Sequence, residues 1–317
     1  MKSTKDICNH TKQSEKKKYR VRNWKQYNES LVHRGSLIVW IPDDVEYIWY
    51  AVSGRNTYQD TAINIILTLK SLYNLPLRAT EGFVQSVFGL AGLSLQVPDY
   101  TTLSRRAGTL NVTLNTVRKE TVNFIADSTG GKVYGEGEWK VRKHGWCKRR
   151  TWKKIHIGID TDGEIRAVVT TENNIHDATP IDDLLNQETQ QIDGFWGDGA
   201  YDAAPVYMSL VAHDIHGIHI PPHKNAQIRF RASTTSPPYV RDENIRGIRK
   251  LGRATWKRTS GYHTRSLVEN TMYRYKTAFG ERISFRTKDN QHTEVMVKCN
   301  ILNKFRELGR PLSYVVT

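Results

Sequence analysis

Between residues 57 and 108 the apolar side chains recur at helical spacing. A first helix is predicted over 57–74, because its apolar residues follow a period of about 3.6 and Pro76 ends the pattern. A second is predicted over 77–90, and a third begins at Asp99 or Thr101, both of which are good N-caps. A helix, a glycine-containing turn and a short basic helix also outline a helix-turn-helix, although an ordinary three-helix packing unit has the same pattern.

From residue 120 the pattern changes to short apolar runs that alternate with helical segments. Two strands, 153–159 and 165–171, flank the dipeptide Asp162-Gly163, which is typical of a hairpin turn. The remaining predicted segments are strands at 122–126, 194–197 and 215–220, and helices at 176–186, 203–212 and 292–308. Strands interleaved with helices in this order predict a mixed α/β sheet with helices on its faces.

Two aspartates are predicted to lie at the ends of strands. Asp127 follows the apolar run 122–126, and Asp198 follows 194–197. The carboxyl ends of strands are where ligands and active sites collect in α/β sheets, and Gly197 and Gly199 leave room for a metal or a phosphate beside Asp198. Aspartate is also common in turns after strands, so neither residue alone indicates a site.

A helix predicted over 261–276 carries a stripe of polar residues. At about 100° per residue, Tyr262, Arg265, Glu269 and Lys276 project within roughly 60° of one another. Apolar side chains lie beside this stripe, at Val268, Met272, Tyr275 and Phe279. Such a helix can bury its apolar face on the sheet and hold Glu269 at the sheet's edge. The alternative is a surface helix with an ordinary Arg–Glu pair four residues apart.

Three carboxylates, Asp127, Asp198 and Glu269, flanked by Arg265 and Lys276, suit phosphodiester chemistry. Two divalent cations can activate a water and stabilise a departing alkoxide, and clustered carboxylates can hold them. Hard oxygen ligands favour Mg²⁺ or Mn²⁺ over zinc. Flanking cations offset phosphate charge and position the strand.

Charge and composition support a nucleic-acid partner. The 317-residue chain carries 47 Lys and Arg against 32 Asp and Glu, a net charge of +15. Phosphate contacts drive the binding of such a surface to DNA, although a ribosome-associated factor is also basic. The three cysteines form no CxxC pair, which fits a reducing cytoplasm, and no apolar run is long enough to span a membrane. His144, Cys147 and His156 lack a fourth ligand at zinc spacing.

Basic segments supply the candidates for DNA contact. The predicted third helix carries Arg105 and Arg106, and Trp256 could stack on an unpaired base or pack in the interior. The stretch 140–154 places cations around three tryptophans, and its candidates are Arg149, Arg150 and Lys153. Residues 1–35 form a basic arm, and 223–260 is a basic segment that we expect to be irregular. Either basic stretch could instead be a solvated surface.

The same residues resemble a known family. Tyr262, Arg265, Glu269 and Lys276 match, with the correct spacing, the tyrosine-arginine-glutamate-lysine motif of bacterial insertion-sequence transposases. Gly197-Asp-Gly-Ala-Tyr-Asp202 and Ile125-Ala-Asp-Ser-Thr-Gly130 look like the two aspartate motifs of the insertion-sequence-five group. Residues 98–106 and 220–226 are also similar to that group, so the resemblance runs from about residue 55 to 308.

The resemblance implies a ribonuclease-H-like core and a DDE transposase mechanism. Asp127, Asp198 and Glu269 would hold two Mg²⁺ or Mn²⁺ ions, and the substrates would be terminal inverted repeats and target DNA, both double-stranded. The domains expected are the arm 1–35, a helical DNA-binding region 36–118, a catalytic domain 119–308 and a tail 309–317. The alternatives are a structure-specific nuclease of the same fold and a non-catalytic repressor derived from a transposase.

We also expect assembly to depend on DNA. A protomer with a net charge of +15 resists self-association, so a stable dimer is expected only when DNA neutralises the repulsion. The segment 223–260 is expected to be mobile without DNA and ordered on it. The sequence predicts a cytoplasmic protein associated with the nucleoid, with no membrane partner.

Overall fold

The computed structural model describes residues 18–52, 57–133, 152–229 and 239–316. In the first part of the chain the elements are β1 (Lys18–Val21), α1 (Trp24–Arg34), η1 (Leu37–Val39), α2 (Asp60–Leu72), α3 (Leu77–Leu90) and α4 (Tyr100–Ala107). The three helices predicted for this region are confirmed. Asp99 is the N-cap of α4, and its carboxylate accepts a hydrogen bond from the Thr102 N–H.

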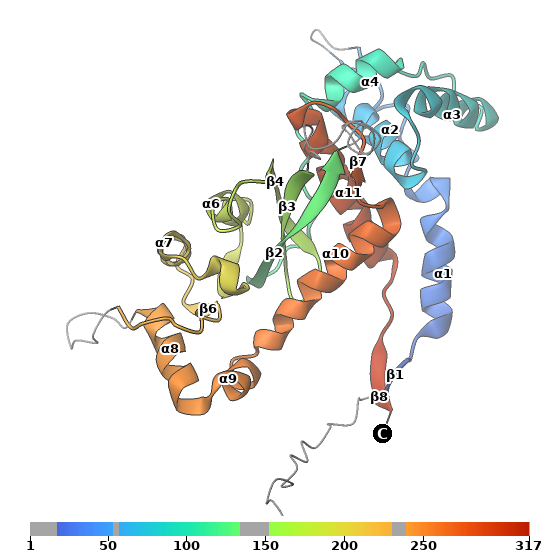
Figure 1. The fold of residues 1–317 in the computed structure, drawn as a ribbon. Helices are drawn as coiled ribbons and strands as arrows, with labels where there is room; N and C mark the ends of the chain where they lie inside the picture. Colours follow the sequence, from blue (N-terminus) through green and yellow to red (C-terminus); the bar gives the residue numbers. More distant parts are fainter. Residues whose placement is uncertain (1–17, 53–56, 134–151, 230–238, 317) are drawn as a thin grey trace, which may run out of the picture.

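A mixed sheet with helices on both faces forms the second part (Figure 1). Its strands are β2 (Thr121–Val133), β3 (Trp152–Ile159), β4 (Ile165–Glu172), β5 (Gln191–Trp196), β6 (Gly217–His219) and β7 (Arg282–Ile283). The order is β4-β3-β2-β5-β6, with β7 pairing the far end of β2. Strands β2, β3 and β4 pair antiparallel, whereas β5 and β6 continue the sheet in parallel. This is the mixed arrangement of a ribonuclease-H-like core, as predicted.

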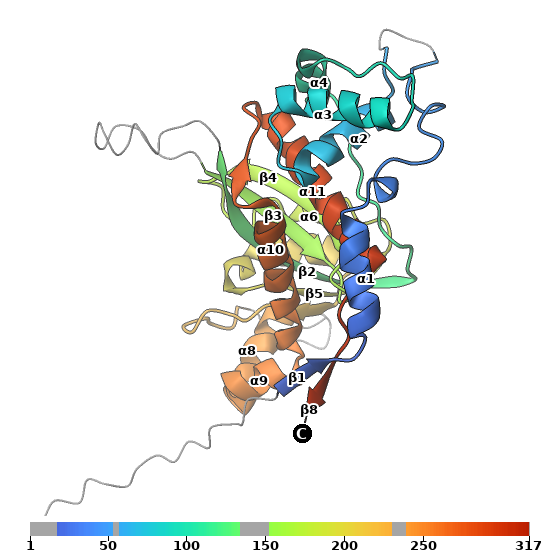
Figure 2. The same ribbon diagram turned by 90° about the vertical axis from the view of Figure 1, so that its right-hand side faces the viewer.

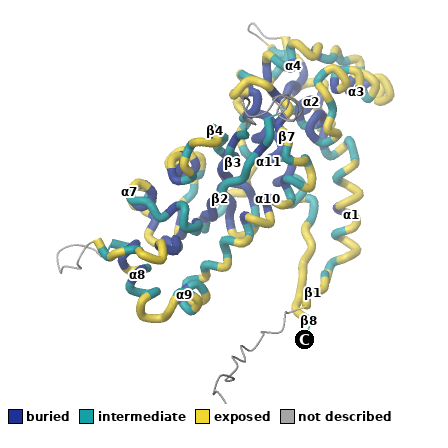
Figure 3. Tube along the Cα trace, in the orientation of Figure 1, coloured by how far each residue is buried: buried dark blue, intermediate teal, exposed yellow. Residues whose placement is uncertain are grey.

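The helical elements of this part divide between the two faces. They are α6 (Ile181–Leu185), η3 (Gly199–Tyr201), α7 (Ala204–Ala212), α8 (Val240–Leu251), α9 (Arg253–Thr259), η4 (Tyr262–Arg265), α10 (Ser266–Phe279) and α11 (Lys288–Leu308). Side chains of α6 and α7 share one apolar core with Phe124 and Ala126 of β2. Side chains of α10 and α11 share another core with Ile125, on the opposite face of β2. The sheet therefore lies between two helical layers, as the dark interior of Figure 3 shows.

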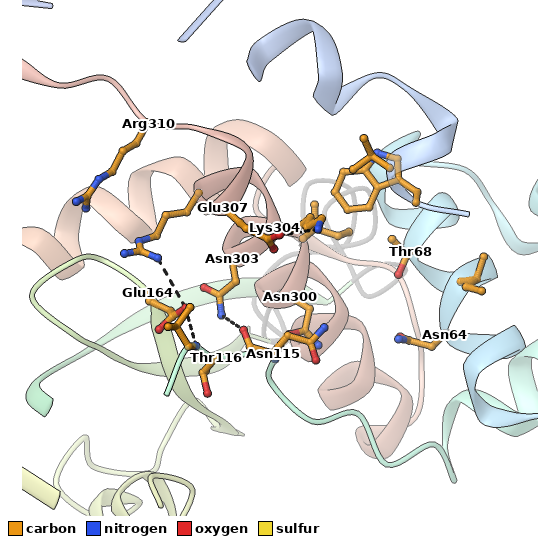
Figure 4. Close-up of a pocket in the computed structure, with 16 residues that line it drawn as sticks. Asn64, Thr68, Asn115, Thr116, Glu164, Asn300, Asn303, Lys304, Glu307 and Arg310 are labelled. Atoms are coloured by element: carbon orange, nitrogen blue, oxygen red, sulfur yellow. Dashed lines mark hydrogen bonds and ion pairs between the residues drawn. The ribbon is translucent and has the colours of Figure 1, made fainter. Parts of the chain in front are cut away.

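Helix α11 also belongs to the helical region. Its residues Val297 and Ile301 pack with Ile63 and Ile66 of α2, whereas Met296 and Cys299 face the sheet. Asparagines of α11 hold the extended linker that connects the two regions. Asn303 donates to Asn115 O and Ile165 O and accepts from Ile165 N–H at 2.8 Å. A polar pocket of about 700 Å³ lies beside these contacts at the junction (Figure 4).

The termini of the described chain pair with each other. β8 (Ser313–Val316) runs antiparallel to β1 as a separate two-stranded sheet beyond the N-terminal end of α1 (Figure 2). The predicted basic arm and tail therefore meet in one structural unit. None of the described helices combines the length and apolar character that crossing a lipid bilayer requires.

Several predicted segments differ from the structure. The basic segment 223–260 is not irregular throughout, because α8 and α9 occupy much of it and Ile245 and Trp256 are buried. The predicted helix 261–276 is two elements, η4 followed by α10. The connection between α3 and α4, residues 91–99, is longer than the three- or four-residue turn of a helix-turn-helix. The α3–α4 pair therefore lacks that motif's short turn.

Candidate active site

Asp127 lies inside β2 and not at its end. The prediction that it closes a short strand is wrong, because the small residues 128–131 continue the strand and pair with β3. Successive residues of a strand alternate between faces. Asp127 therefore shares the face of Ile125, which packs in the core formed with α10 and α11. This alternation points its carboxylate toward the helix that carries Glu269.

Asp198 follows the end of β5, the strand next to β2, at the level of Asp127. Strands β2 and β5 are parallel, and Ile125 is opposite Trp196, so two further residues on each strand lead to Asp127 and Asp198. Adjacent strands are about 4.8 Å apart. Asp198 follows the end of β5 closely, near the position predicted for it, and its Oδ1 accepts the Ala200 N–H at 2.8 Å as the cap of η3.

Gly197 has a different role from the one predicted. A Cβ atom there would lie 2.9 Å from both the Phe195 and the Tyr201 rings. The missing side chain therefore makes room for the buried Tyr201 ring and not for a metal. A Cβ on Gly199 would meet only Pro221 O, at an ordinary 3.7 Å. There is thus no room for a side chain at Gly197, before Asp198, whereas there is room for one at Gly199, after it.

Arg265 connects the third carboxylate to the first. Its Nη1 lies 2.8 Å from Asp127 Oδ2, and its Nη2 contacts Glu269 Oε1. Element η4, which carries Arg265, packs against both β2 and β5, and α10 then buries Val268 and Met272 on the sheet. The helical stripe thus holds Glu269 at the edge of the sheet, as predicted. The Arg–Glu pair is part of this site because Arg265 also binds Asp127.

Burial and neighbouring negative charges both disfavour the ionised form of Asp127. Burial raises the pKa of Asp127, and the negative charges of Asp198 and Glu269 raise it further. The Ser128 N–H and Arg265 offset this only in part. An additional positive charge at this point would therefore stabilise the ionised carboxylate.

Comparison with protein families agrees with this geometry. A family model described as "Transposase DDE domain" matches residues 118–304, and a second with the same description matches residues 32–136. The first match covers more than half of the chain and includes Asp127, Asp198 and Glu269. The chain belongs to the DDE transposase family. Its closer relation to the insertion-sequence-five group stays a prediction.

The carboxylates of this transposase suit the divalent cations that the family implies. Asp127, Asp198 and Glu269 offer only hard oxygen ligands, and the half-buried Asp127 needs a cationic partner. Arg265 is that partner here. Within the described ranges no three His, Cys, Asp or Glu side chains lie close enough together to hold one metal ion. The side chains of Arg265 and Glu269 must therefore move before the three carboxylates can share one.

Three side chains predicted to contact DNA are buried and have partners within the protein. Arg106 donates to Tyr58 O at 2.9 Å and pairs with Asp60. Lys153 pairs with Glu172, and Trp256 packs beside Tyr262 with their rings 6.2 Å apart. We do not retain these three as DNA contacts. The partners of Arg106 and Lys153 are distant in sequence, and a local sequence pattern does not reveal such partners.

The remaining predicted contacts lie in different places. Arg105 is exposed on α4, at the opposite end of the molecule from α8 and α9 (Figures 1 and 2). Tyr262 is half-buried beside Arg265. Lys276 lies about 10 Å further along α10 than Glu269, by the helical rise, and is 3.6 Å from Glu281. Arg149 and Arg150 fall outside the described residues, as do His144 and Cys147.

Sequence reasoning missed Tyr201, which lies beside the carboxylates. Its buried hydroxyl has no hydrogen-bond partner among the residues that the structure describes, and its pKa is raised well above normal by burial and by Asp127, Asp177 and Asp198. Asp177 Oδ1 lies 3.0 Å from Lys154 Nζ. Burial raises the pKa of Asp177, but hydrogen bonds from Lys154 and Ser128 outweigh it and lower the pKa. Ser128 follows Asp127 directly, so Asp177 supports the strand next to Asp127.

Proposed function

We propose that this transposase binds the ends of an insertion sequence and catalyses metal-dependent strand cleavage and strand transfer. The observation that carries the proposal is the link from Asp127 through Arg265 to Glu269, with Asp198 just after the end of the neighbouring strand β5. These residues combine a carboxylate cluster with a cation that can bind phosphate, which a purely structural ion pair on a surface helix would not need.

Each group has a part in the proposed reaction. Asp127, Asp198 and Glu269 would hold two Mg²⁺ or Mn²⁺ ions, which when bound activate the nucleophile and stabilise the departing oxygen. Arg265 releases the carboxylates as it binds a phosphate oxygen of the DNA and positions the scissile bond. A water oxygen then forms a bond to phosphorus while the bond to the 3′ oxygen breaks. In transfer, the freed 3′-hydroxyl attacks a target phosphodiester in the same way.

The test uses the full chain and a duplex cut from the DNA that flanks the coding region. Incubation with Mg²⁺ should give cleavage at the end of the element and then joining of that end to a second DNA. Cleavage without joining would favour the alternative nuclease. Binding without cleavage in either Mg²⁺ or Mn²⁺ would favour the repressor and overturn the proposal.

Arg265→Ala and Arg105→Ala should have opposite effects. Arg265 touches two catalytic carboxylates, so its loss should slow cleavage by about 100-fold and change end binding little. Arg105 is exposed on α4, far from those carboxylates, so its loss should weaken binding of the terminal repeat. Anisotropy titrations and single-turnover cleavage measure the two effects separately.

Arg106→Ala is the matched control on the same helix. It should lower the free energy of unfolding by about 1–2 kcal/mol, because the half-buried Tyr58 carbonyl loses its donor, and should leave the sequence preference unchanged. Unaltered terminal-repeat affinity in Arg105→Ala would refute a role for α4 in DNA binding.

A further inference from the structure

The small sheet of β1 and β8, here called the terminal ribbon, is anchored to the body at one end. The Arg22 N–H donates to Leu312 O at 2.7 Å, and the Asn23 side chain bridges Arg310 O and the Leu312 N–H. Arg34, the last residue of α1, donates to Phe305 O of α11 and to Gly309 O, directly after that helix. The ribbon is therefore a fixed projection of the fold.

Most side chains of the terminal ribbon are exposed. Its residues are exposed in both strands apart from the half-buried Val21 and Val316. No further strand pairs with it in the part of the chain that the structure describes. A two-stranded sheet alone is only marginally stable in water. The exposed faces of this one are therefore available to a partner that would stabilise it.

The register gives the two faces of the ribbon different chemistry. Residues directly opposite each other in an antiparallel pair share a face. Lys18 pairs with Val316 and Arg20 with Tyr314, which places both cations and one aromatic ring on one face. Tyr19, 64% exposed, pairs with Val315 on the other face. One face is therefore basic and the other apolar.

Further positive charge lies next to the ribbon along the chain. The exposed Arg22 and Lys25 follow β1, Arg310 precedes β8 and pairs with Asp162, and neither strand contains an acidic residue. The ribbon lies at the same end of the molecule as α8 and α9 in both views (Figures 1 and 2). Arg249, Lys250 and Arg258 are exposed on those two helices. Helix α9 leads directly through η4 to Arg265 at the active site.

We propose that the basic face of the terminal ribbon, with Lys18 and Arg20, is a DNA-binding surface separate from the active site and from α4. The charge selects a polyanion, and a two-stranded β-ribbon fits the major groove of B-form DNA. The proposed contacts are phosphates, so binding through this face is independent of sequence. This inference rests on the proposed function for its partner, double-stranded DNA.

The test compares two double variants of the full chain. Lys18→Gln with Arg20→Gln removes two charges from the basic face, whereas Tyr19→Thr with Val315→Thr alters only the apolar face and keeps β-forming residues. Binding to a linear duplex of unrelated sequence is titrated against salt. Losing two phosphate contacts should reduce the slope of log K against log salt by about 1.8 and weaken binding on the order of tenfold. Lys18→Arg with Arg20→Lys should bind like the wild type.

Every other result would contradict either the DNA-binding role of the ribbon or the proposed function. An unchanged slope in Lys18→Gln with Arg20→Gln overturns the inference, provided that the wild type still binds and cleaves DNA. Loss of DNA affinity in Tyr19→Thr with Val315→Thr, together with a smaller sedimentation coefficient without DNA, would identify a contact between copies and also overturn it. A wild type that binds no duplex at all would overturn the proposed function itself. Unfolding curves check that every variant is folded.

Discussion

Single replacement of Asp127, Asp198 or Glu269 by the matching amide should reduce strand cleavage by at least about a thousandfold, as for cooperating catalytic residues. The amide keeps the size of the side chain and removes the charge that would hold a divalent cation. DNA affinity should stay close to that of the wild type, because binding rests on many basic groups spread over the surface.

Strand β5 supplies the matched control for this experiment. Asp193 is exposed on the same strand that leads to Asp198, and Asp193→Asn should cleave like the wild type. Cleavage is measured in single turnover with Mg²⁺ and with Mn²⁺, and binding with Ca²⁺ in place of both. Substantial cleavage by Asp127→Asn, Asp198→Asn or Glu269→Gln would remove that residue from the catalytic set.

Arg166→Met, away from the active site, should lower the free energy of unfolding by about 3–5 kcal/mol. The Arg166 guanidinium is buried and binds both carboxylate oxygens of Glu188, at 2.7 and 3.0 Å. It also binds Glu164 at 2.9 Å, and both glutamates are almost inaccessible to solvent. Without the arginine, Glu188 would lose its cationic partner, and Glu164 would keep only the more distant Arg306, at 3.7 Å.

Neutralising the glutamates tests this explanation. In the Arg166→Met background, Glu164→Gln with Glu188→Gln should recover part of the lost stability, because the penalty comes from unpaired charge. Arg118→Met is the control. Arg118 is exposed and follows Val117 in the linker between the helical region and the sheet. Urea unfolding measures all four proteins. A loss for Arg166→Met no larger than that for Arg118→Met would show that the buried ion pairs contribute little.

The parts of the site that could be predicted are those set by local periodicity. The spacing of Arg265 and Glu269 follows from one helical turn, and the apolar Val268 and Met272 fix which way that turn faces. The strand that carries Asp127 was underestimated because Ser-Thr-Gly-Gly resembles a turn, whereas β3 supplies a pairing partner for each of those residues. That partner is separated in sequence, and a local pattern carries no information about it.

Nonlocal pairing also explains the errors in the basic segments. Helix α8 is rich in charge and was expected to be irregular, but Arg241 is buried against Asp202, with Nε 2.7 Å from Oδ1. Arg106 and Lys153 likewise have partners far from them in the sequence. An arginine or lysine that pairs in the interior and one that contacts DNA are the same residue type in the sequence. Only the fold separates them.

The shared use of α11 has a consequence for the order in which the protein can be made. The core of the helical region is incomplete until Val297 and Ile301, which follow Ile66 by more than 200 residues, have left the ribosome. Until then Ile63 and Ile66 can pack only with the earlier helices of the same region. Completion of α11 closes this core and the sheet's core together, so we expect a chain that stops before α11 to leave both cores incomplete.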